Sequence, residues 1–322
     1  MTFSRHVLAI DPRAVTEQIV EFIRTSVRDV LRRKGAVLGL SGGVDSSVVA
    51  ALSARALGPE QTLGLLMPER DSSPDSLRLA RQLAEVLGIP TLLEDAEPIL
   101  AAAGCYRRQE EAVRRVFPEF GPGYRLRLTL PSLLDGDRLS VTRLNIESPT
   151  GVQQSARMSS TAYLELVAAT NFKQRVRKML EYHHADRLRY AVAGTPNRLE
   201  LDQGFFVKQG DGASDLKPIA HLYKTQVYAL AEYLGVPDEI RSRPPTTDTF
   251  SMAQTQEEFF FCLPYDKMDL CLYGHDHQIA PVEVGAALGL AAEQIERVYR
   301  DIEQKRRVAQ YLRAEPLLLA GG

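Results

Sequence analysis

The run SGGVDSS at residues 41–47 has the composition of a phosphate site. It follows the apolar run 36–40, which predicts a buried strand, and precedes the apolar run 48–52, which predicts the start of a packed helix. A glycine-rich turn between a strand and a helix presents backbone N–H groups and the positive end of the helix dipole to an anion. The glycines allow close approach of the backbone, the serine hydroxyls add donors, and the carboxylate of Asp45 can hold Mg²⁺ on the same phosphates.

This loop is not a P-loop of the GxxxxGK[ST] type, because no lysine follows the glycines, and it is not a GxGxxG dinucleotide turn. The SGGxDS pattern resembles the pyrophosphate-binding loop of the PP-loop, or N-type, ATP pyrophosphatases. Those enzymes cleave ATP to AMP and pyrophosphate, and they use AMP to activate an acid or carbonyl group. The alternative is an ordinary helix capped by serine and glycine, in which Asp45 is only an acidic partner of the helix dipole.

Six further segments are similar to motifs of one family of PP-loop enzymes. They are MPERDSSP at 67–74, NFKQRVRKM at 171–179, GTPNRLE at 194–200, GFFVKQGDGASD at 204–215, LYKTQ at 222–226 and PPTTD at 244–248. The ammonia-dependent NAD synthetases carry similar motifs. The chain resembles that family over about residues 12–95 and 165–310.

The resemblance implies a ligase that uses ATP and Mg²⁺ to amidate nicotinic acid adenine dinucleotide, giving NAD, AMP and pyrophosphate. A carboxylate is a poor electrophile because its leaving group would be oxide, so the acid is first adenylated and ammonia then displaces AMP. The adenylation step carries much negative charge, which explains a need for cations and metal around the phosphates. The resemblance also implies a homodimer. The chain has no room for a glutaminase domain, so free ammonia or a separate amidotransferase is expected to supply the nitrogen.

The resemblance places ATP and its metal on one group of residues. Asp45 and Glu200 are the expected Mg²⁺ ligands, facing each other from adjacent strand ends, and Mg²⁺ favours such carboxylates together with phosphates. Asp45 and Lys224 are also candidate catalytic residues. The residues expected around ATP are Ser41, Gly42, Gly43, Asp45, Ser46, Ser47, Thr195, Lys224 and Thr246.

A second group is expected around the dinucleotide substrate. Arg175 is placed to meet a substrate phosphate or ribose. Lys208 and Asp215 lie in a glycine-rich loop expected to close over the substrate, and Lys208 is a third candidate catalytic residue. Lys305 matches a lysine that the family carries in its last helix, near the active site.

Several of these residue types have a plainer explanation. Arg175 and Arg177 fit a solvated helix face, Lys224 fits a surface lysine, and residues 210–212 fit an ordinary turn. His275-Asp276-His277 has metal-binding residue types, but no third ligand is evident and a polar loop is the favoured interpretation.

Three departures from the family pattern all fall on the acceptor side. Gln304 stands where the family has histidine, Gln209 replaces the usual tyrosine, and residues 101–160 are longer than the usual connection. The alternative function is therefore a related amide ligase that adenylates a different carboxylate. A nucleotide-binding protein without activity is a further alternative, which the acidic and basic residues of the ATP group disfavour.

Composition narrows the class of protein. The 322 residues are 44% hydrophobic and 25% charged, as in an ordinary globular protein. A formal net charge of −2 provides no basic field of the kind that attracts nucleic acid, so no nucleic-acid partner is expected. The three cysteines form no CxxC pair, which argues against a disulfide framework, a structural zinc site or an iron–sulfur cluster. The chain shows no signal peptide and no apolar stretch near the ~18 residues of a membrane span, so a cytoplasmic enzyme without a membrane partner is expected.

The apolar periodicity predicts alternating helices and strands. The expected helices are 12–34, 74–87, 161–184, 223–234 and 295–311, and the expected strands are 36–40, 62–67, 90–93 and 188–193. This alternation predicts an α/β fold, a doubly wound and mostly parallel sheet with helices on both faces, in a single domain of residues 1–322.

Residues 101–160 interrupt that alternation. A charged run is followed by two stretches of alternating polarity, 125–130 and 139–146, which flank Asp135-Gly136-Asp137 and predict a β-hairpin. We interpret the segment as an insertion or lid over the sheet, with a disordered loop as the alternative.

Overall fold

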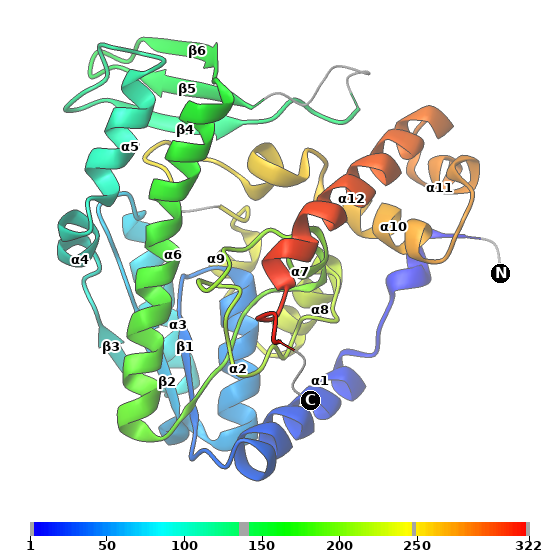
Figure 1. Cartoon of the computed structure of the whole chain (residues 1–322). Helices are drawn as coiled ribbons and strands as arrows, with labels where there is room; N and C mark the ends of the chain where they lie inside the picture. The colour runs from blue at the N-terminus through cyan, green and yellow to red at the C-terminus, as the bar shows by residue number, and fades with distance from the viewer. Residues whose placement is uncertain (1–2, 135–141, 247–248, 320–322) are drawn as a thin grey trace.

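A parallel sheet forms the centre of the computed structural model, which describes residues 3–134, 142–246 and 249–319 (Figure 1). In the described part of the chain the sheet has four strands in the order β3-β2-β1-β7. Their bounds are β1 Ala36–Gly39, β2 Thr62–Leu66, β3 Thr91–Leu93 and β7 Ala191–Val192. All neighbouring pairs run parallel, and β1 pairs with both β2 and β7. The chain adds β2 and β3 on one side of β1 and β7 on the other, so the strand order reverses at β1. Parallel α/β sheets bind ligands at such a switch point.

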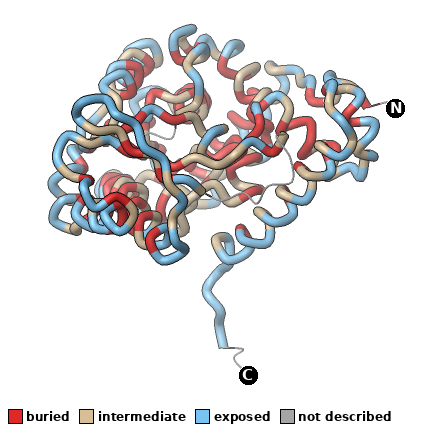
Figure 2. The backbone as a smooth tube through the Cα atoms, turned by 90° about the horizontal axis from the view of Figure 1, so that it is seen from above, coloured by how far each residue is buried: buried red, intermediate tan, exposed pale blue. Residues whose placement is uncertain are grey.

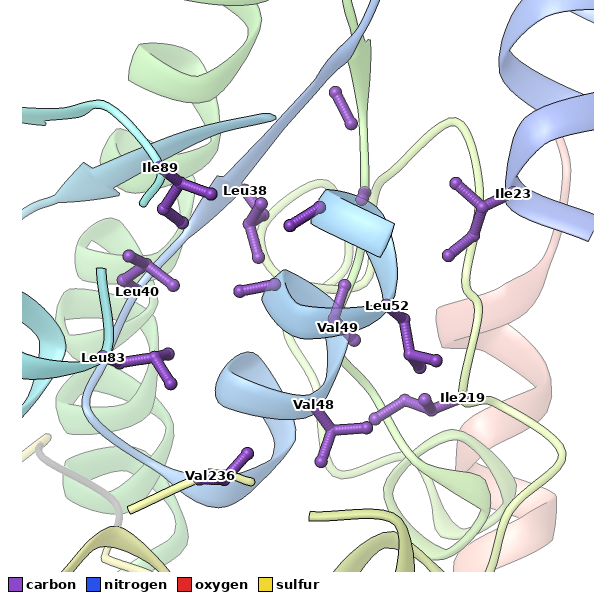
Figure 3. Packing of buried hydrophobic residues seen from close by; sticks show 14 of the residues in the cluster. Ile23, Leu38, Leu40, Val48, Val49, Leu52, Leu83, Ile89, Ile219 and Val236 are labelled. Atoms are coloured by element: carbon purple, nitrogen blue, oxygen red, sulfur yellow. The ribbon is translucent and has the colours of Figure 1, made fainter. Parts of the chain in front are cut away.

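Helices cover both faces of this sheet, because successive side chains of a strand point to opposite faces. Leu38 of β1 packs with α1 (Pro12–Thr25), α2 (Val44–Leu57), α3 (Pro74–Leu87) and α8 (Lys224–Tyr233), as Figure 3 shows for part of this cluster. Val37 faces the opposite cluster, formed with α4 (Glu97–Ala102) and α6 (Ser160–Leu188). The predicted doubly wound α/β fold is confirmed.

Two predicted boundaries differ from the structure. The first helix ends as an α-helix at Thr25 and continues only as a π turn, η2 (Ser26–Val30). The predicted strand 188–193 is reduced to β7, because α6 extends through Leu188 and ends at Arg189 in the left-handed conformation. Short 3₁₀ turns, η1 (Arg5–Leu8) and η3 (Pro59–Gln61), precede α1 and β2.

Residues 101–160 form ordered structure where the chain is described. The helix α5 (Cys105–Arg114) packs along α6, and an antiparallel sheet of β4 (Arg125–Thr129), β5 (Arg143–Glu147) and β6 (Gln153–Arg157) follows (Figure 1). The predicted β-hairpin is present as β4 and β5, and the disordered-loop alternative is wrong for the described residues. The predicted turn at Asp135-Gly136-Asp137 lies outside them. The strand β6 was not predicted; it is a largely exposed edge strand of mostly polar residues.

The last third of the chain is helical, as predicted. After α7 (Arg198–Gln203), it contains α8, α9 (Asp238–Ser242), the π turn η4 (Glu257–Phe261), α10 (Tyr265–Asp276), α11 (Pro281–Leu288) and α12 (Ala292–Arg313). The polar loop expected at 275–277 is wrong for its first two residues, since His275 and Asp276 form the last turn of α10. Beyond α12, residues 314–319 are exposed (Figure 2). Among the described helices, none combines the length and the apolar character that crossing a membrane requires.

Candidate active site

A cleft of about 560 Å³ opens at the carboxyl ends of β1 and β2, where parallel α/β sheets bind their ligands. Its floor includes Gly39 at the end of β1 and Met67 just beyond β2. Its walls come from the 41–46 loop, α6, the turns after β7, the segment 243–260 and α12. The cleft therefore collects residues from both halves of the chain.

The 41–46 loop has the geometry of an anion site. Gly43 is the N-cap residue of α2, so the unpaired N–H groups of the first helical turn face the cleft. Gly42 has φ +73°, and a Cβ there would lie 2.5 Å from the carbonyl oxygen of Ser76. Ser46 Oγ lies 3.1 Å from Ser41 Oγ, and both residues line the cleft. Ser47 does not, because its buried hydroxyl donates to the Gly43 carbonyl oxygen at 2.8 Å.

A buried charge cluster lies beside this loop. Lys224 is fully buried and its ammonium forms an ion pair with the Oδ2 atom of Asp45. Burial first, and the nearby Asp45 carboxylate second, raise the pKa of Glu200 to about 8. Burial alone would lower the pKa of Lys224, but Asp45 and Glu200 together raise it. All three residues line the cleft, so this corner carries two carboxylates and one ammonium group.

Local helix caps position the two carboxylates. Asp45 lies in the first turn of α2, and its Oδ1 atom accepts a hydrogen bond from Asn197 Nδ2 at 3.0 Å. Glu200 lies in the first turn of α7, where it forms a capping box with Asn197. The carboxylates thus come from the helices that follow β1 and β7. The prediction that Glu200 lies at a strand end is corrected, because Glu200 lies in the first turn of α7. The sequence reasoning missed Asn197, although its place three residues before a glutamate is a capping-box signal.

The donor set of this corner suits Mg²⁺. Asp45 and Glu200 supply two hard oxygen ligands, and no group of three or more His, Cys, Asp or Glu residues is arranged for a metal in the described ranges. Mg²⁺ is commonly held by one or two carboxylates, with phosphates and water completing its shell. The residues present therefore fit a magnesium ion that arrives with a phosphate ligand.

Two threonines of the ATP group also reach the cleft. Thr195 follows β7, and Thr246 lies on the opposite wall, where it forms an isolated β-bridge with Thr255. Of the predicted ATP residues, Ser41, Gly43, Asp45, Ser46, Thr195, Lys224 and Thr246 line the cleft, while Gly42 and Ser47 shape the loop behind it.

The four residues expected around the dinucleotide do not line the cleft. Lys208 Nζ donates to the carbonyl oxygens of Tyr311 and Ala314 at 2.9 and 3.1 Å, at the end of α12. Arg175 Nε donates to the carbonyl oxygen of Lys208 at 3.2 Å. In this conformation both side chains are engaged outside the cleft.

Asp215 and Lys305 form hydrogen bonds to backbone groups of other segments. Asp215 Oδ2 accepts from the backbone N–H of Val192 at 2.8 Å, next to β7. Lys305 Nζ donates to the carbonyl oxygen of Phe260 at 2.7 Å, which holds a cleft-lining segment against α12. Gln304 lies exposed on the same helix.

The loop at 204–215 contributes other residues instead. Phe205, Phe206, Val207 and Asp211 line the cleft. Asp211 Oδ1 accepts from the backbone N–H of Val207 at 2.7 Å, which closes the turn, and burial raises the pKa of Asp211. The plain-turn interpretation of this stretch therefore describes part of its structure, but Asp211 also places a carboxylate in the cleft.

Helix α6 adds charged groups that the sequence reasoning did not assign. Lys178 and Glu181 form a buried ion pair on the cleft, and burial raises the pKa of Glu181. Lys173 is also buried there, and its ammonium lies 3.0 Å from Glu69 Oε1 and 2.6 Å from Asp71 Oδ2. A lysine in a mostly polar helix looks solvent-exposed in the sequence, so only packing reveals these pairs.

The sheet, the glycine-rich loop and the buried carboxylates together define a nucleotide-binding enzyme of the adenine nucleotide alpha hydrolase-like fold. A family model described as NAD synthase matches residues 15–117 and 134–311. The chain belongs to the NAD synthase family, whose members are ligases that form carbon–nitrogen bonds. The resemblance drawn from the sequence motifs is thereby confirmed.

Curated relatives span nearly the whole chain. The NH(3)-dependent NAD(+) synthetase of Mesorhizobium japonicum is 61% identical over 97% of this chain and 98% of its own length. The protein of the same name from Rhizobium meliloti is 53% identical over 99% of this chain and 95% of its own.

Solved structures support the fold. NMN synthetase from Francisella tularensis superimposes with a TM-score of 0.64 at 23% identity, covering 97% of this chain and all of that one. The NH3-dependent NAD synthetase from Campylobacter jejuni superimposes with a TM-score of 0.62 at 24% identity, covering 96% of this chain and all of its own.

Proposed function

We propose that this protein amidates nicotinic acid adenine dinucleotide to NAD, using ATP, Mg²⁺ and ammonia and releasing AMP and pyrophosphate. The observation that carries the proposal is the cluster of Asp45, Glu200 and Lys224 beside the 41–46 loop, inside one cleft. Support also comes from the relative in Mesorhizobium japonicum, which is an NH(3)-dependent NAD(+) synthetase at 61% identity.

In the first step, a carboxylate oxygen of the substrate attacks the α-phosphorus of ATP, and the bond to pyrophosphate breaks. The N–H groups of the 41–46 loop and the α2 dipole hold the departing pyrophosphate. Lys224, charged at neutral pH, neutralises part of its negative charge. Asp45 and Glu200 would hold Mg²⁺, which would supply further charge stabilisation to the phosphates when bound.

In the second step, the nitrogen of ammonia attacks the acyl carbon, the bond to AMP breaks, and the new amide nitrogen loses a proton. Val167 and Tyr163 of α6 line the cleft and give it an apolar wall. Asp211 lies in the same cleft, and its raised pKa, caused by burial, suits a group that receives a proton.

Three finer points remain predictions from the resemblance. We propose that free ammonia, or ammonia from a separate amidotransferase, supplies the nitrogen. We also propose that the protein is a homodimer and that it is cytoplasmic. Size measurement by light scattering tests the dimer directly.

A second candidate function is amidation of a different carboxylate by the same ATP chemistry. Arg175, Lys208 and Asp215 are engaged outside the cleft, so the expected contacts to a dinucleotide are not formed in this conformation. The fold also occurs in a protein named NMN synthetase, whose product is a mononucleotide.

One end-point assay separates the two candidates. The protein is incubated with ATP, Mg²⁺ and ammonium, and with either nicotinic acid adenine dinucleotide or nicotinic acid mononucleotide, and the products are quantified by mass. Equal amounts of NAD, AMP and pyrophosphate from the dinucleotide are expected. Pyrophosphate release with the mononucleotide alone would replace the first candidate by the second.

A further inference from the structure

One wall of the cleft is built by residues 249–262, which we call the wall segment. Thr249, Phe250, Gln256, Phe259 and Phe260 of this segment line the cleft. Its regular structure within the described chain is limited to the bridge at Thr255 and the turn η4. A segment with so few internal hydrogen bonds depends on its neighbours for a defined position.

The neighbour along most of its length is the stretch 125–134, which we call the brace: β4 and the residues that follow it. The brace and the wall segment are joined by backbone hydrogen bonds at several points. Met252 N donates to Leu126 O at 3.1 Å, Leu130 N donates to Glu258 O at 3.1 Å, and Leu133 N donates to Cys262 O at 3.2 Å. The brace thus lies alongside the wall segment from its beginning to its end.

Side chains strengthen the same junction. Gln254 is buried, with 3% of its surface exposed, and its Nε2 atom donates to the carbonyl oxygen of Leu128. Ser251 Oγ accepts from the backbone N–H of Leu126 at 3.0 Å. Gln254 does not line the cleft, so its position on the wall segment serves the junction.

The aromatic side chains of the wall share a core with the insertion. Phe250 and Phe259 pack with Leu126, Leu128, Leu144 and Ile146, and they also line the cleft. Phe205, from the loop at 204–215, stacks on Phe260 with ring centroids 4.8 Å apart. A shift of the brace would therefore move the cleft wall and the loop that contacts it, because packed rings transmit displacement.

Other contacts hold the wall segment near its middle and at its two ends. Near the middle, Gln256 N donates to the Pro245 carbonyl oxygen at 3.0 Å and Thr255 forms the bridge with Thr246. Lys173 Nζ donates to the Thr249 carbonyl oxygen at 2.8 Å, and Lys305 Nζ donates to the Phe260 carbonyl oxygen at 2.7 Å. The 41–46 loop is held by the hydrogen bond between Ser41 and Ser46 and by the contacts of Asp45 with Asn197 and Lys224. The hydrogen bonds named above join the brace to the wall segment and not to the 41–46 loop.

We propose that the brace is a positioning element, which holds the wall segment in its substrate-binding position and so sets the KM for the carboxylate substrate. The positioning residues are Leu128 of the brace and Gln254 of the wall segment, which are joined by a hydrogen bond. This assigns residues 101–160 a role beside the cleft wall, in place of a lid over the sheet. The proposal rests on the amide-ligase function proposed above.

The test uses two variants outside the cleft and one matched control. Leu128→Ala removes a side chain that is 1% exposed from the shared core, and Gln254→Met removes the donor to Leu128 while keeping the length of the side chain. Leu83→Ala, on α3, is the control, because Leu83 is equally buried, belongs to a different cluster and does not line the cleft.

Three measurements are made on each full-length protein: steady-state kinetics, equilibrium binding of a non-hydrolysable ATP analogue with Mg²⁺, and amide hydrogen exchange. Leu128→Ala and Gln254→Met are expected to raise the KM for the carboxylate about tenfold, since small displacements of binding groups have effects of that order or larger. Affinity for the ATP analogue is expected to change less than about twofold, and the Met252 amide is expected to exchange faster.

The outcomes show whether a raised KM comes from a displaced wall segment or from a general loss of stability. A KM that rises equally in Leu83→Ala would overturn the proposal, and so would an unchanged KM in both Leu128→Ala and Gln254→Met. Unaltered exchange at Met252 in Leu128→Ala would contradict the brace whatever the substrate is. A wild-type protein that makes no NAD would count against the proposed function alone, and the kinetic comparison would then use the carboxylate that does release pyrophosphate.

Discussion

Lys224 and Asp45 form a buried ion pair, although 179 residues separate them in the chain. Lys224 begins α8 and Asp45 lies in the first turn of α2, so the pair joins two helix N-termini on one face of the sheet. The carboxylate of Asp269 fixes the lysine backbone, accepting from Lys224 N at 3.2 Å and from Thr225 N at 2.7 Å. A positive charge is thereby held beside the phosphate loop before any ligand binds, which is the preorganisation that adenylation requires.

Asp45→Asn should abolish turnover while the protein remains folded. The amide keeps the size of the side chain, but it removes the metal-binding charge, so pyrophosphate release is expected to fall by at least about a thousandfold. Glu200 remains beside Lys224, so the ammonium keeps one carboxylate partner. Pyrophosphate release and thermal unfolding are measured together; retained turnover in the folded variant would remove Asp45 from the metal site.

The stability of the metal-free protein should fall as pH rises from about 4.5 to about 8. Burial and Asp45 raise the pKa of Glu200 from its ordinary value of 4.5 to about 8 in the folded state. The folded state therefore binds more protons than the unfolded state in this window, and the stabilisation present below the unfolded pKa is lost as pH passes through the folded pKa.

Thermal unfolding across this pH range, with and without Mg²⁺, checks that dependence. Mg²⁺ binds the ionised carboxylate and should lessen the fall. Glu200→Gln should flatten the profile, because the amide does not titrate. An identical slope in the variant would assign the pH dependence to another group.

Lys178→Met should destabilise the protein more than the double variant that also carries Glu181→Leu. The single change leaves Glu181, of which 7% of the surface is exposed, as an unpaired buried charge, a loss of about 3–5 kcal/mol in such cases. Replacing both partners by apolar groups is often neutral. Urea unfolding of the wild type, Lys178→Met, Glu181→Leu and the double variant gives the coupling energy, and an additive result would contradict the pairing.

Gly42→Ala should weaken binding of ATP. A Cβ at this position would lie 2.5 Å from the Ser76 carbonyl oxygen, and the φ of +73° is itself unfavourable for alanine. Gly58→Ala is the matched control, because Gly58 also has a positive φ, +99°, but no atom lies within 4 Å of its Cβ position.

Both variants should lose about 1 kcal/mol or more of stability from the backbone strain. Only Gly42→Ala should also lower the affinity for an ATP analogue, since only there must the phosphate loop shift. Equal affinities in the two variants would show that the loop tolerates the added carbon.

Much of the ATP side could be predicted from the sequence. The strand, glycine-rich loop and helix at 36–57 are consecutive in the chain, so their local pattern specifies their geometry. The same holds for the cap of α7, where Asn197 and Glu200 lie three residues apart. Such motifs can be recognised in a single sequence because each depends on hydrogen bonds between residues that are close in the chain.

The substrate side depended on tertiary structure. Lys208 contacts the end of α12, more than 100 residues away, and Asp215 contacts β7. The segment 101–160, predicted as an insertion or lid, contains α5 and a small antiparallel sheet, whose strand β4 is hydrogen-bonded to the segment 249–262. No local pattern encodes these partners.

The class of fold, the phosphate loop and the family could be recognised in the sequence, because each is carried by patterns of residues that are close in the chain. Which charged side chains reach the cleft, and which bond to other segments outside it, became visible in the folded structure. Lys173 and Lys178 are both lysines of one helix, yet each is buried against a carboxylate, and Lys173 reaches partners about 100 residues distant. Whether a lysine is buried depends on packing between distant segments, because burial of an ammonium group is tolerated only where a carboxylate pairs with it.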